Sequence, residues 1–519
     1  MQTANHSQSK LDSFIKNPKK ALWKMTAPFF LGLSVQSVYM LMDTMFVGKF
    51  LVRDGASECT IQSLSQAALD AMGAVFPLMF VIMGLTFGLG SGVTTLIAQY
   101  IGKQDKKSAD SVATHTVLIG LILPIIITGI VLILGDFIMN LELRNASDAT
   151  KEYAKQYFQI MAFGSIFMIL AIFFRSILSG EGETVLPMKV LGFGTILNII
   201  LDPIFIIVFK LEVAGAAYAT VISNGVVAIS FMYLLIIKKK SYTTISFRKN
   251  IFKFDYKIVR SLFKLGIPAS LSFAIMSFGM FAQNSILSYS DQNSNSNNNP
   301  SFRYEVENKL NTNTEIDNPC YEDGVVYKES SGGVIGGYQT AARIENLFMN
   351  LVIALSSSIV TIVGMFYGAK RIDLIRPIIN YALKWSIILS VAATIIFFSL
   401  SEIMLNLFTN DHKTIEEGIN FFNICAFSLP FVAIGMLTCR AMQGMDKPTP
   451  FLFITVLRVI LIALPMAWIG VKYFDYGVNW VWWSVLASSI ITTLFSLIWM
   501  YKIIHQNEKM YIETATNLK

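Results

Sequence analysis

Long apolar runs separated by short polar connections repeat along the whole chain of 519 residues. Each run reaches about 20 residues, the length that a helix needs to cross a hydrocarbon core of about 30 Å. The pattern therefore predicts an all-α polytopic membrane protein with twelve transmembrane helices. The expected spans cover about residues 25–48, 71–98, 112–139, 156–178, 187–209, 215–237, 264–288, 336–364, 377–400, 418–440, 449–471 and 479–504.

A basic connection at 238–263 divides these spans into two sets of six, 25–237 and 264–504. Polar tails are expected on either side, at 1–24 and 505–519. We interpret the first tail as cytoplasmic, because it has no apolar core followed by a cleavage site for a signal peptide.

The two sets resemble each other at corresponding span ends. The second span ends in Ala98-Gln-Tyr-Ile-Gly102 and the eighth in Gly364-Met-Phe-Tyr-Gly368. The fourth span ends with Arg175 and Gly180, and Pro187 follows. The tenth span ends in the same order, with Arg440 and Gly444, and Pro450 follows. Repeats in the same orientation predict two pseudo-symmetric six-helix bundles with a central site between them. We expect both arginines to extend to the cytoplasmic surface.

The distribution of charge predicts the orientation in the membrane. Of all residues 54% are hydrophobic and only 14% charged, and the net charge of +7 comes largely from Lys and Arg in short loops. These basic loops alternate with loops that hold few cations, so the positive-inside rule places both termini in the cytoplasm of a multi-pass cell membrane protein. We therefore interpret these basic residues as the groups that orient the protein in the lipid bilayer. Nucleic-acid binding is not expected.

One connection departs from the pattern. Residues 289–332 are rich in Asn and Ser, and we expect them to form a polar disordered insertion on the non-cytoplasmic side. Cys59 and Cys320 lie in loops on that same side, so a disulfide between them and two free thiols are both open interpretations. The four Cys and four His show no spacing typical of a metal, haem or iron–sulfur site, and no cofactor is expected.

Chemistry is sought within the spans, because the chain has no P-loop, no G-x-S-x-G and no H-E-x-x-H motif. We therefore expect a protein that is not an enzyme and that takes its energy from an ion gradient. Asp43 in the first span and Asp202 in the fifth are acids at membrane depth, where a carboxylate costs about 2.5 to 3.5 kcal/mol. Neither has an acidic counterpart in the second half, where Leu464 takes the place of Asp202.

The stretch from Asn198 to Pro203 is the strongest candidate site. Asn198 and Asp202 are four residues apart, so a helix places both side chains on one face. Pro203 has no N–H and tends to free a carbonyl of the preceding turn close to the carboxylate. The sixth span opens with small residues that permit close helix packing and adds a hydroxyl at Thr220. These oxygens predict a site for Na⁺ or a proton, and an acid that merely pairs with a neighbouring helix is the alternative.

Further residues are candidates for a substrate cavity. Soft and aromatic side chains can form an adaptable pocket. Arg343 and Glu345, which open the eighth span, either line its mouth or form a local pair. The candidate cavity residues are Gln36, Tyr39, Met40, Phe163, Met168, Arg343 and Glu345.

At this point the chain resembles the multidrug and toxic compound extrusion (MATE) transporters, most closely their bacterial-type branch. The resemblance covers nearly all of residues 20–505 and rests on the order of several short motifs, which include Met42-Asp-Thr-Met-Phe-Val-Gly48, Asn198 to Pro203, Gly215 to Thr220 and Ala342-Arg-Ile-Glu345. It implies two six-helix lobes that export organic cations in exchange for Na⁺ or H⁺.

The resemblance also implies a cation site in the first lobe, at Asp43, Asn198, Asp202 and Thr220. Some branches of the family carry further acids in the seventh and tenth helices, and this chain has none there. We therefore expect a monomeric efflux transporter for small organic cations or drugs that works by alternating access. A flippase for a lipid-linked oligosaccharide or a related amphiphile is the alternative.

Overall fold

The computed structural model describes residues 11–50, 58–142, 147–245, 254–298, 333–406 and 412–517. These residues are helical apart from short connections and contain no strand, which confirms the all-α prediction. The first bundle consists of α2 (Pro18–Phe50), α3 (Glu58–Gly102), α4 (Lys106–Glu142), α5 (Asp148–Gly180), α6 (Val185–Pro203) and α7 (Glu212–Met232). The second consists of α8 (Tyr256–Asn298), α10 (Gly333–Gly368), α11 (Ile372–Asn406), α12 (His412–Cys425) with α13 (Leu429–Gly444), α14 (Thr449–Val456) with α15 (Leu464–Tyr473), and α16 (Val478–Asn517).

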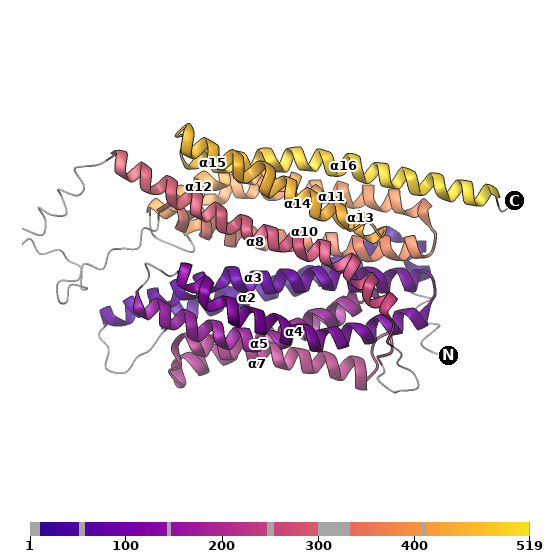
Figure 1. Cartoon of the computed structure of the whole chain (residues 1–519), viewed down its shortest axis with the longest axis horizontal. Coiled ribbons are helices and arrows are strands. Elements are labelled where there is room, and N and C mark those ends of the chain that lie inside the picture. Colours follow the sequence, from indigo (N-terminus) through magenta and orange to yellow (C-terminus); the bar gives the residue numbers. More distant parts are fainter. Residues whose placement is uncertain are drawn as a thin grey trace, which may run out of the picture.

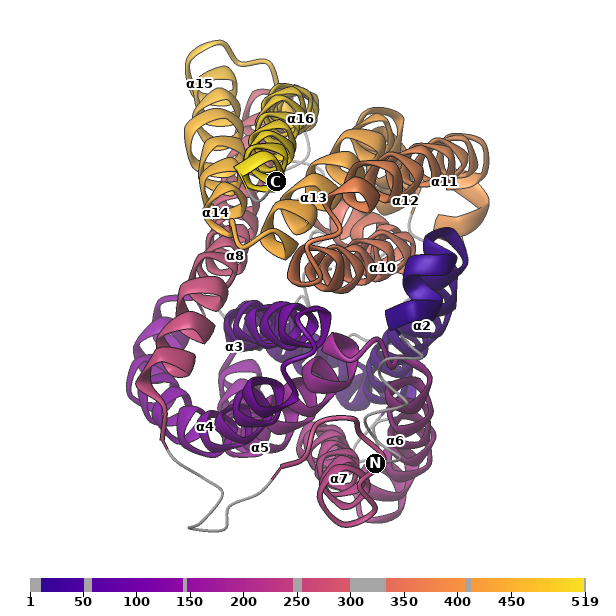
Figure 2. The ribbon, with the colours of Figure 1, turned by 90° about the vertical axis from the view of Figure 1, so that its right-hand side faces the viewer.

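The two bundles lie side by side with their long helices roughly parallel (Figures 1 and 2). Within the described residues, 11 helical stretches are long and apolar enough to cross a membrane. The helix α2 packs among them against α6 and α10 and completes the first set of six. Helix α2 begins and α16 ends at the same end of the molecule, which we call the terminal end (Figure 1).

The repeated motifs bring the bundles together at the terminal end. A Cβ on Gly102 would lie 2.1 Å from the carbonyl oxygen of Met365, and one on Gly368 would lie 2.1 Å from the carbonyl oxygen of Gln99. The two backbones therefore touch where each copy of the motif has its last glycine. The side-chain amide of Gln99 adds a hydrogen bond of 3.0 Å to the carbonyl oxygen of Gly444.

The interpretation of Arg175 and Arg440 was wrong, because neither reaches the surface. Their exposed fractions are 8% and 5%. The guanidinium of Arg175 lies 5.1 Å from the ring of Phe87, and that of Arg440 lies 5.7 Å from the ring of Phe273. Because aromatic faces attract cations, these rings replace part of the water that a guanidinium would otherwise seek at the surface.

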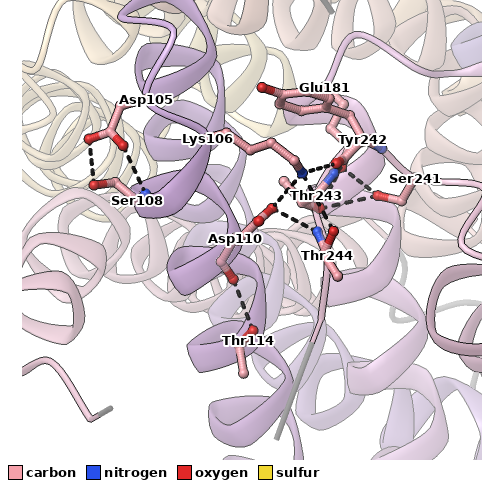
Figure 3. Close-up of polar contacts among 10 residues, drawn as sticks. All are labelled: Asp105, Lys106, Ser108, Asp110, Thr114, Glu181, Ser241, Tyr242, Thr243 and Thr244. Atoms are coloured by element: carbon pink, nitrogen blue, oxygen red, sulfur yellow. Dashed lines mark hydrogen bonds and ion pairs between the residues drawn. The ribbon is translucent and has the colours of Figure 1, made fainter. Parts of the chain in front are cut away.

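The connection after α7 is held against the first bundle by two carboxylates (Figure 3). Glu181, which directly follows α5, accepts hydrogen bonds from the backbone N–H groups of Tyr242 and Thr243, both at 2.9 Å. Asp110 in α4 accepts the backbone N–H of Thr244 at 2.7 Å. The start of the connection is therefore a fixed part of the terminal end.

Helix α8 is longer than the sequence pattern predicted. It continues as a helix to Asn298, so the expected insertion at 289–332 does not begin at 289. Tyr289 explains part of this extension, since its ring packs 5.6 Å from that of Trp468 in α15 and gives the polar end of the helix an apolar contact. Residues 299–332 lie outside the described part of the chain.

Candidate functional site

The candidate site lies inside the first bundle, where α6 and α7 approach each other closely. A Cβ on Gly215 would lie 2.9 Å from the backbone carbon of Phe205, and one on Gly194 would lie 2.2 Å from the side chain of Val227. The absence of side chains at these two glycines lets the helices pack tightly, as small residues do in membrane bundles. The contact places Thr220 of α7 opposite the Asn198 face of α6.

The four predicted site residues come together at this contact. Asp43, Asn198, Asp202 and Thr220 are each at most 5% exposed. The hydroxyl of Thr220 donates to Oδ2 of Asp43 at 3.2 Å, and Nδ2 of Asn198 lies 3.4 Å from Oδ1 of Asp202 and 3.5 Å from Oγ1 of Thr220. The two carboxyl groups are close enough to interact electrostatically. Three helices therefore contribute to one buried polar cluster.

Three oxygens of this cluster have no hydrogen-bond donor among the described residues. They are Oδ1 of Asp43, Oδ1 of Asn198 and Oδ2 of Asp202, and all three are buried. An unpartnered polar atom in an apolar interior is unfavourable by about 1 to 3 kcal/mol. Oxygen atoms of carboxylates and amides are ligands of hard cations, so the donor set fits a small cation or a proton shared between the carboxylates.

Pro203 changes the helix directly beside the carboxylate. The helix α6 ends at Pro203 and continues as a single π-helical stretch, Ile204–Val208, in which the N–H of Phe209 bonds to the carbonyl oxygen of Ile204. The proline nitrogen cannot donate, so the backbone hydrogen-bond pattern is interrupted one residue after Asp202. Widened turns of this kind occur frequently at functional sites.

A cavity adjoins the cluster on the side of the terminal end. The space in it that is open to a water molecule is about 40 Å³. The lining residues are Gln36, Leu191, Gly194, Thr195, Asn198, Thr220, Ser223, Asn224 and Val227. Sequence reasoning missed Thr195, Ser223 and Asn224, although each lies three or four residues from Asn198 or Thr220 and thus on the same helix face.

Of the seven predicted substrate-cavity residues, Gln36 is the one that lines this cavity. Phe163 is 67% exposed and Met168 packs against the core of the first bundle, so neither takes part in it. Arg343 and Glu345 both lie on α10 in the other bundle. The side chains of Tyr39 and Met40 lie outside the described part of the structure.

Comparison with known proteins identifies the family. The profile of the MatE family matches residues 28–204 and 327–469. The chain belongs to the MatE family. A probable multidrug resistance protein NorM from Thermotoga maritima is 23% identical over 92% of this chain and 91% of its own length. The multidrug export protein MepA from Staphylococcus aureus is 22% identical over 97% of both chains.

Solved structures agree with this assignment. A MOP superfamily transporter from Pyrococcus furiosus, described as having a binding pocket of reverse polarity, superimposes with a TM-score of 0.80 and is 26% identical over 95% of this chain and 97% of its own. A multidrug resistance MATE transporter in an outward-facing conformation gives a TM-score of 0.79, with 25% identity over 94% of this chain and 96% of its own. This chain is therefore a member of the MATE transporters with their twelve-helix fold. The relatives are transporters rather than enzymes, and none of those named here supports a flippase.

Proposed function

We propose that this protein is a secondary antiporter that exports organic cations and other xenobiotics in exchange for Na⁺ or H⁺. The observation that carries the proposal is the set of three buried oxygens without donors, on Asp43, Asn198 and Asp202. Such a set is unfavourable when empty and is satisfied by a cation or a proton. The relatives are named multidrug resistance and multidrug export proteins, which supports drugs as the exported molecules.

The cluster gives a physical basis for exchange. Two ionised carboxylates so close together in a buried site repel each other, so the site favours a state in which a proton or a metal cation neutralises part of the charge. A substrate cation that needs the ionised carboxylates competes with that proton or cation. Because each ligand favours a different state of one site, binding of one promotes release of the other.

The arrangement of the bundles supports alternating access. The hydrogen bonds between the bundles are concentrated toward the terminal end, as in the bond of 3.0 Å from the hydroxyl of Thr361 to the carbonyl oxygen of Ser179. The related transporter in the outward-facing conformation supports the interpretation that the terminal end is the closed, cytoplasmic side. In this proposal the protein is a monomer in the cell membrane with both termini in the cytoplasm, in line with its basic loops.

The test is dye efflux from vesicles under separately imposed Na⁺ and H⁺ gradients. We expect one gradient to drive efflux, and Asp202→Asn to abolish the driven component while the protein still inserts and folds, because the change removes a charge from the membrane interior. Glu152→Gln, at an exposed carboxylate on α5 outside the cluster, is the control and should retain driven efflux. Full driven efflux by Asp202→Asn at normal expression would refute the assignment of the site.

A further inference from the structure

The cavity beside the cluster is lined by polar groups that the protein does not satisfy. Ser223 is 5% exposed, and its hydroxyl has no hydrogen-bond partner among the described residues. Oδ1 of Asn198 is in the same situation. Many other buried hydroxyls of this chain bond to a carbonyl one turn earlier, as Thr86 does to Ile82 at 2.8 Å. The hydroxyl of Ser223 makes no such bond and is available to the cavity.

Three further polar side chains line the same space. Gln36, Thr195 and Asn224 come from α2, α6 and α7 respectively, and none of them has a side-chain hydrogen bond within the described ranges. The space of about 40 Å³ has room for a few water molecules, since about 10 to 15 Å³ of such space holds one. Thr195, Asn198 and Ser223 are buried, whereas Gln36 and Asn224 are partly exposed. Buried polar groups are almost always hydrogen-bonded, so we expect water in the cavity to satisfy the three buried ones.

The direction of the cavity follows from the two helices. From Asn198 it extends along α6 to Leu191, and from Thr220 it extends along α7 to Val227. Both paths cover seven residues, which is about 10 Å along a helix. Helix α6 begins and α7 ends near the terminal end, so the cavity leads from the carboxylates toward that end (Figure 1).

The far end of the cavity is apolar. Leu191 and Val227 are the hydrophobic side chains among the lining residues, and both lie two turns from the cluster. Val227 also lies against Gly194, where a Cβ would come within 2.2 Å of its methyl group. Apolar constrictions of this kind stop ions by excluding water, and a small change in width wets them.

We propose that this cavity is the inner half of the path of the coupling ion, and that Leu191 and Val227 form its gate. The proposal rests on the proposed antiport and adds a route to it: the ion passes between the carboxylates and the terminal side within the first bundle. The neutral lining suits passage, because amide and hydroxyl oxygens replace part of the hydration shell of a cation without holding it as tightly as a carboxylate. In this proposal the apolar end prevents the ion from crossing while the bundles are in contact at the terminal end.

The route is tested by the accessibility of a cysteine at Ser223. The four native cysteines are replaced by alanine, and Ser223→Cys is labelled with a positively charged, membrane-impermeant methanethiosulfonate reagent added from one side of the membrane at a time. We expect labelling from the terminal side. The rate should rise at least tenfold with Val227→Ala, and likewise with Leu191→Ala, because either change widens the gate.

Two other serines provide the controls. Ser230 lies on α7 two turns beyond Ser223, past Val227, so Ser230→Cys should be labelled from the terminal side whether or not the gate is widened. Ser165 is 2% exposed and lies 3.0 Å from the hydroxyl of Thr128, outside the cavity, so Ser165→Cys should stay unlabelled in every background. A size-exclusion profile identical to that of the parent shows that each variant is folded.

A second measurement separates this proposal from the antiport itself. In vesicles without drug, the two gate variants should dissipate an imposed Na⁺ or H⁺ gradient several times faster than the parent. If Ser223→Cys reacts only from the opposite side or from neither, or if widening the gate changes neither labelling nor leak, the route is refuted, even when drug efflux remains driven by a gradient. A failure of the antiport appears elsewhere, as efflux that ignores both gradients.

Discussion

The contact between the repeated glycines predicts how the conformational equilibrium responds to one added methyl group. In Gly368→Ala, the new Cβ would lie 2.1 Å from the carbonyl oxygen of Gln99, and ordinary contact begins at 3.4 Å. Helix α10 must therefore move away from α3 by more than 1 Å, since the opposing atom belongs to a helical backbone that cannot rotate aside. Overpacking of this kind destabilises an arrangement by about 1 to 3 kcal/mol.

That energy applies to the state in which the bundles touch at the terminal end. A change of about 1 to 3 kcal/mol shifts the ratio of closed to open states by about 5- to 150-fold. The shift can be measured with spin labels at Lys103→Cys and Lys370→Cys in a cysteine-free background, because both residues are exposed and follow the two glycine motifs directly. We expect a longer-distance population to grow in Gly368→Ala, and driven drug efflux to fall with it.

The control is Gly192→Ala, because nothing lies within 4 Å of the Cβ that this change adds. It should leave both the distance distribution and efflux unchanged. If Gly368→Ala gives the same distances as the parent, the backbone contact does not determine closure, and the interpretation of the repeated motif is wrong.

Three other predictions address the site, the connection after α7 and the cysteines. Adding a transported cation to detergent-purified protein in weak buffer should release protons if H⁺ is the coupling ion, and the double variant Asp43→Asn/Asp202→Asn should release none; equal release by both proteins would place the coupling elsewhere. Burial raises the pKa of the Glu181 carboxyl above its usual value near 4.5, against the opposing effect of its hydrogen bonds. The proton-linked part of docking is therefore fully present below about pH 4.5 and is lost as the pH rises through the raised pKa, so the connection should dock more weakly at higher pH. Glu181→Gln should remove this pH dependence, measured by hydrogen exchange of the two amides that it binds and corrected for intrinsic rates. A disulfide between Cys59 and Cys320 and two free thiols both stay open, because Cys320 lies outside the described residues; equal thiol labelling of unfolded protein with and without reductant would exclude the disulfide.

The sequence allowed the helices and the candidate cluster to be predicted for different reasons. Spans follow from the thickness of the hydrocarbon core, so composition alone locates them to within several residues. The pairing of Asn198 with Asp202 follows from the helical period within one span. Asp43 and Thr220 lie beside this pair because of how three helices pack. The hydrophobic pattern alone does not predict that packing, so the prediction also needed the family resemblance.

Features that depend on contacts between distant segments could not be predicted. Arg175 and Arg440 were expected at the surface because a charge near a helix end usually reaches water. Their aromatic neighbours come from other helices, and nothing in the local sequence indicates them. The same holds for Ser223, whose free hydroxyl is visible only when α2, α6 and α7 are seen together around the cavity.

The two bundles share their contact and their helix geometry, but they differ in the acid of the fifth helix. Closure uses both repeats equally, since Gly102 and Gly368 make the same contact from opposite sides. The fifth helix of each repeat also contains a π-helical stretch beside a proline, Ile204–Val208 after Pro203 and Leu457–Ala463 before Pro465. Yet Leu464 stands where the first repeat has Asp202, so only one of the two widened helices carries an acid; the stretch in the second contains Arg458 instead. A symmetric scaffold with an acidic cluster in only one bundle lets binding of one cation act on both bundles through their shared contact, so that a local neutralisation can move the whole molecule.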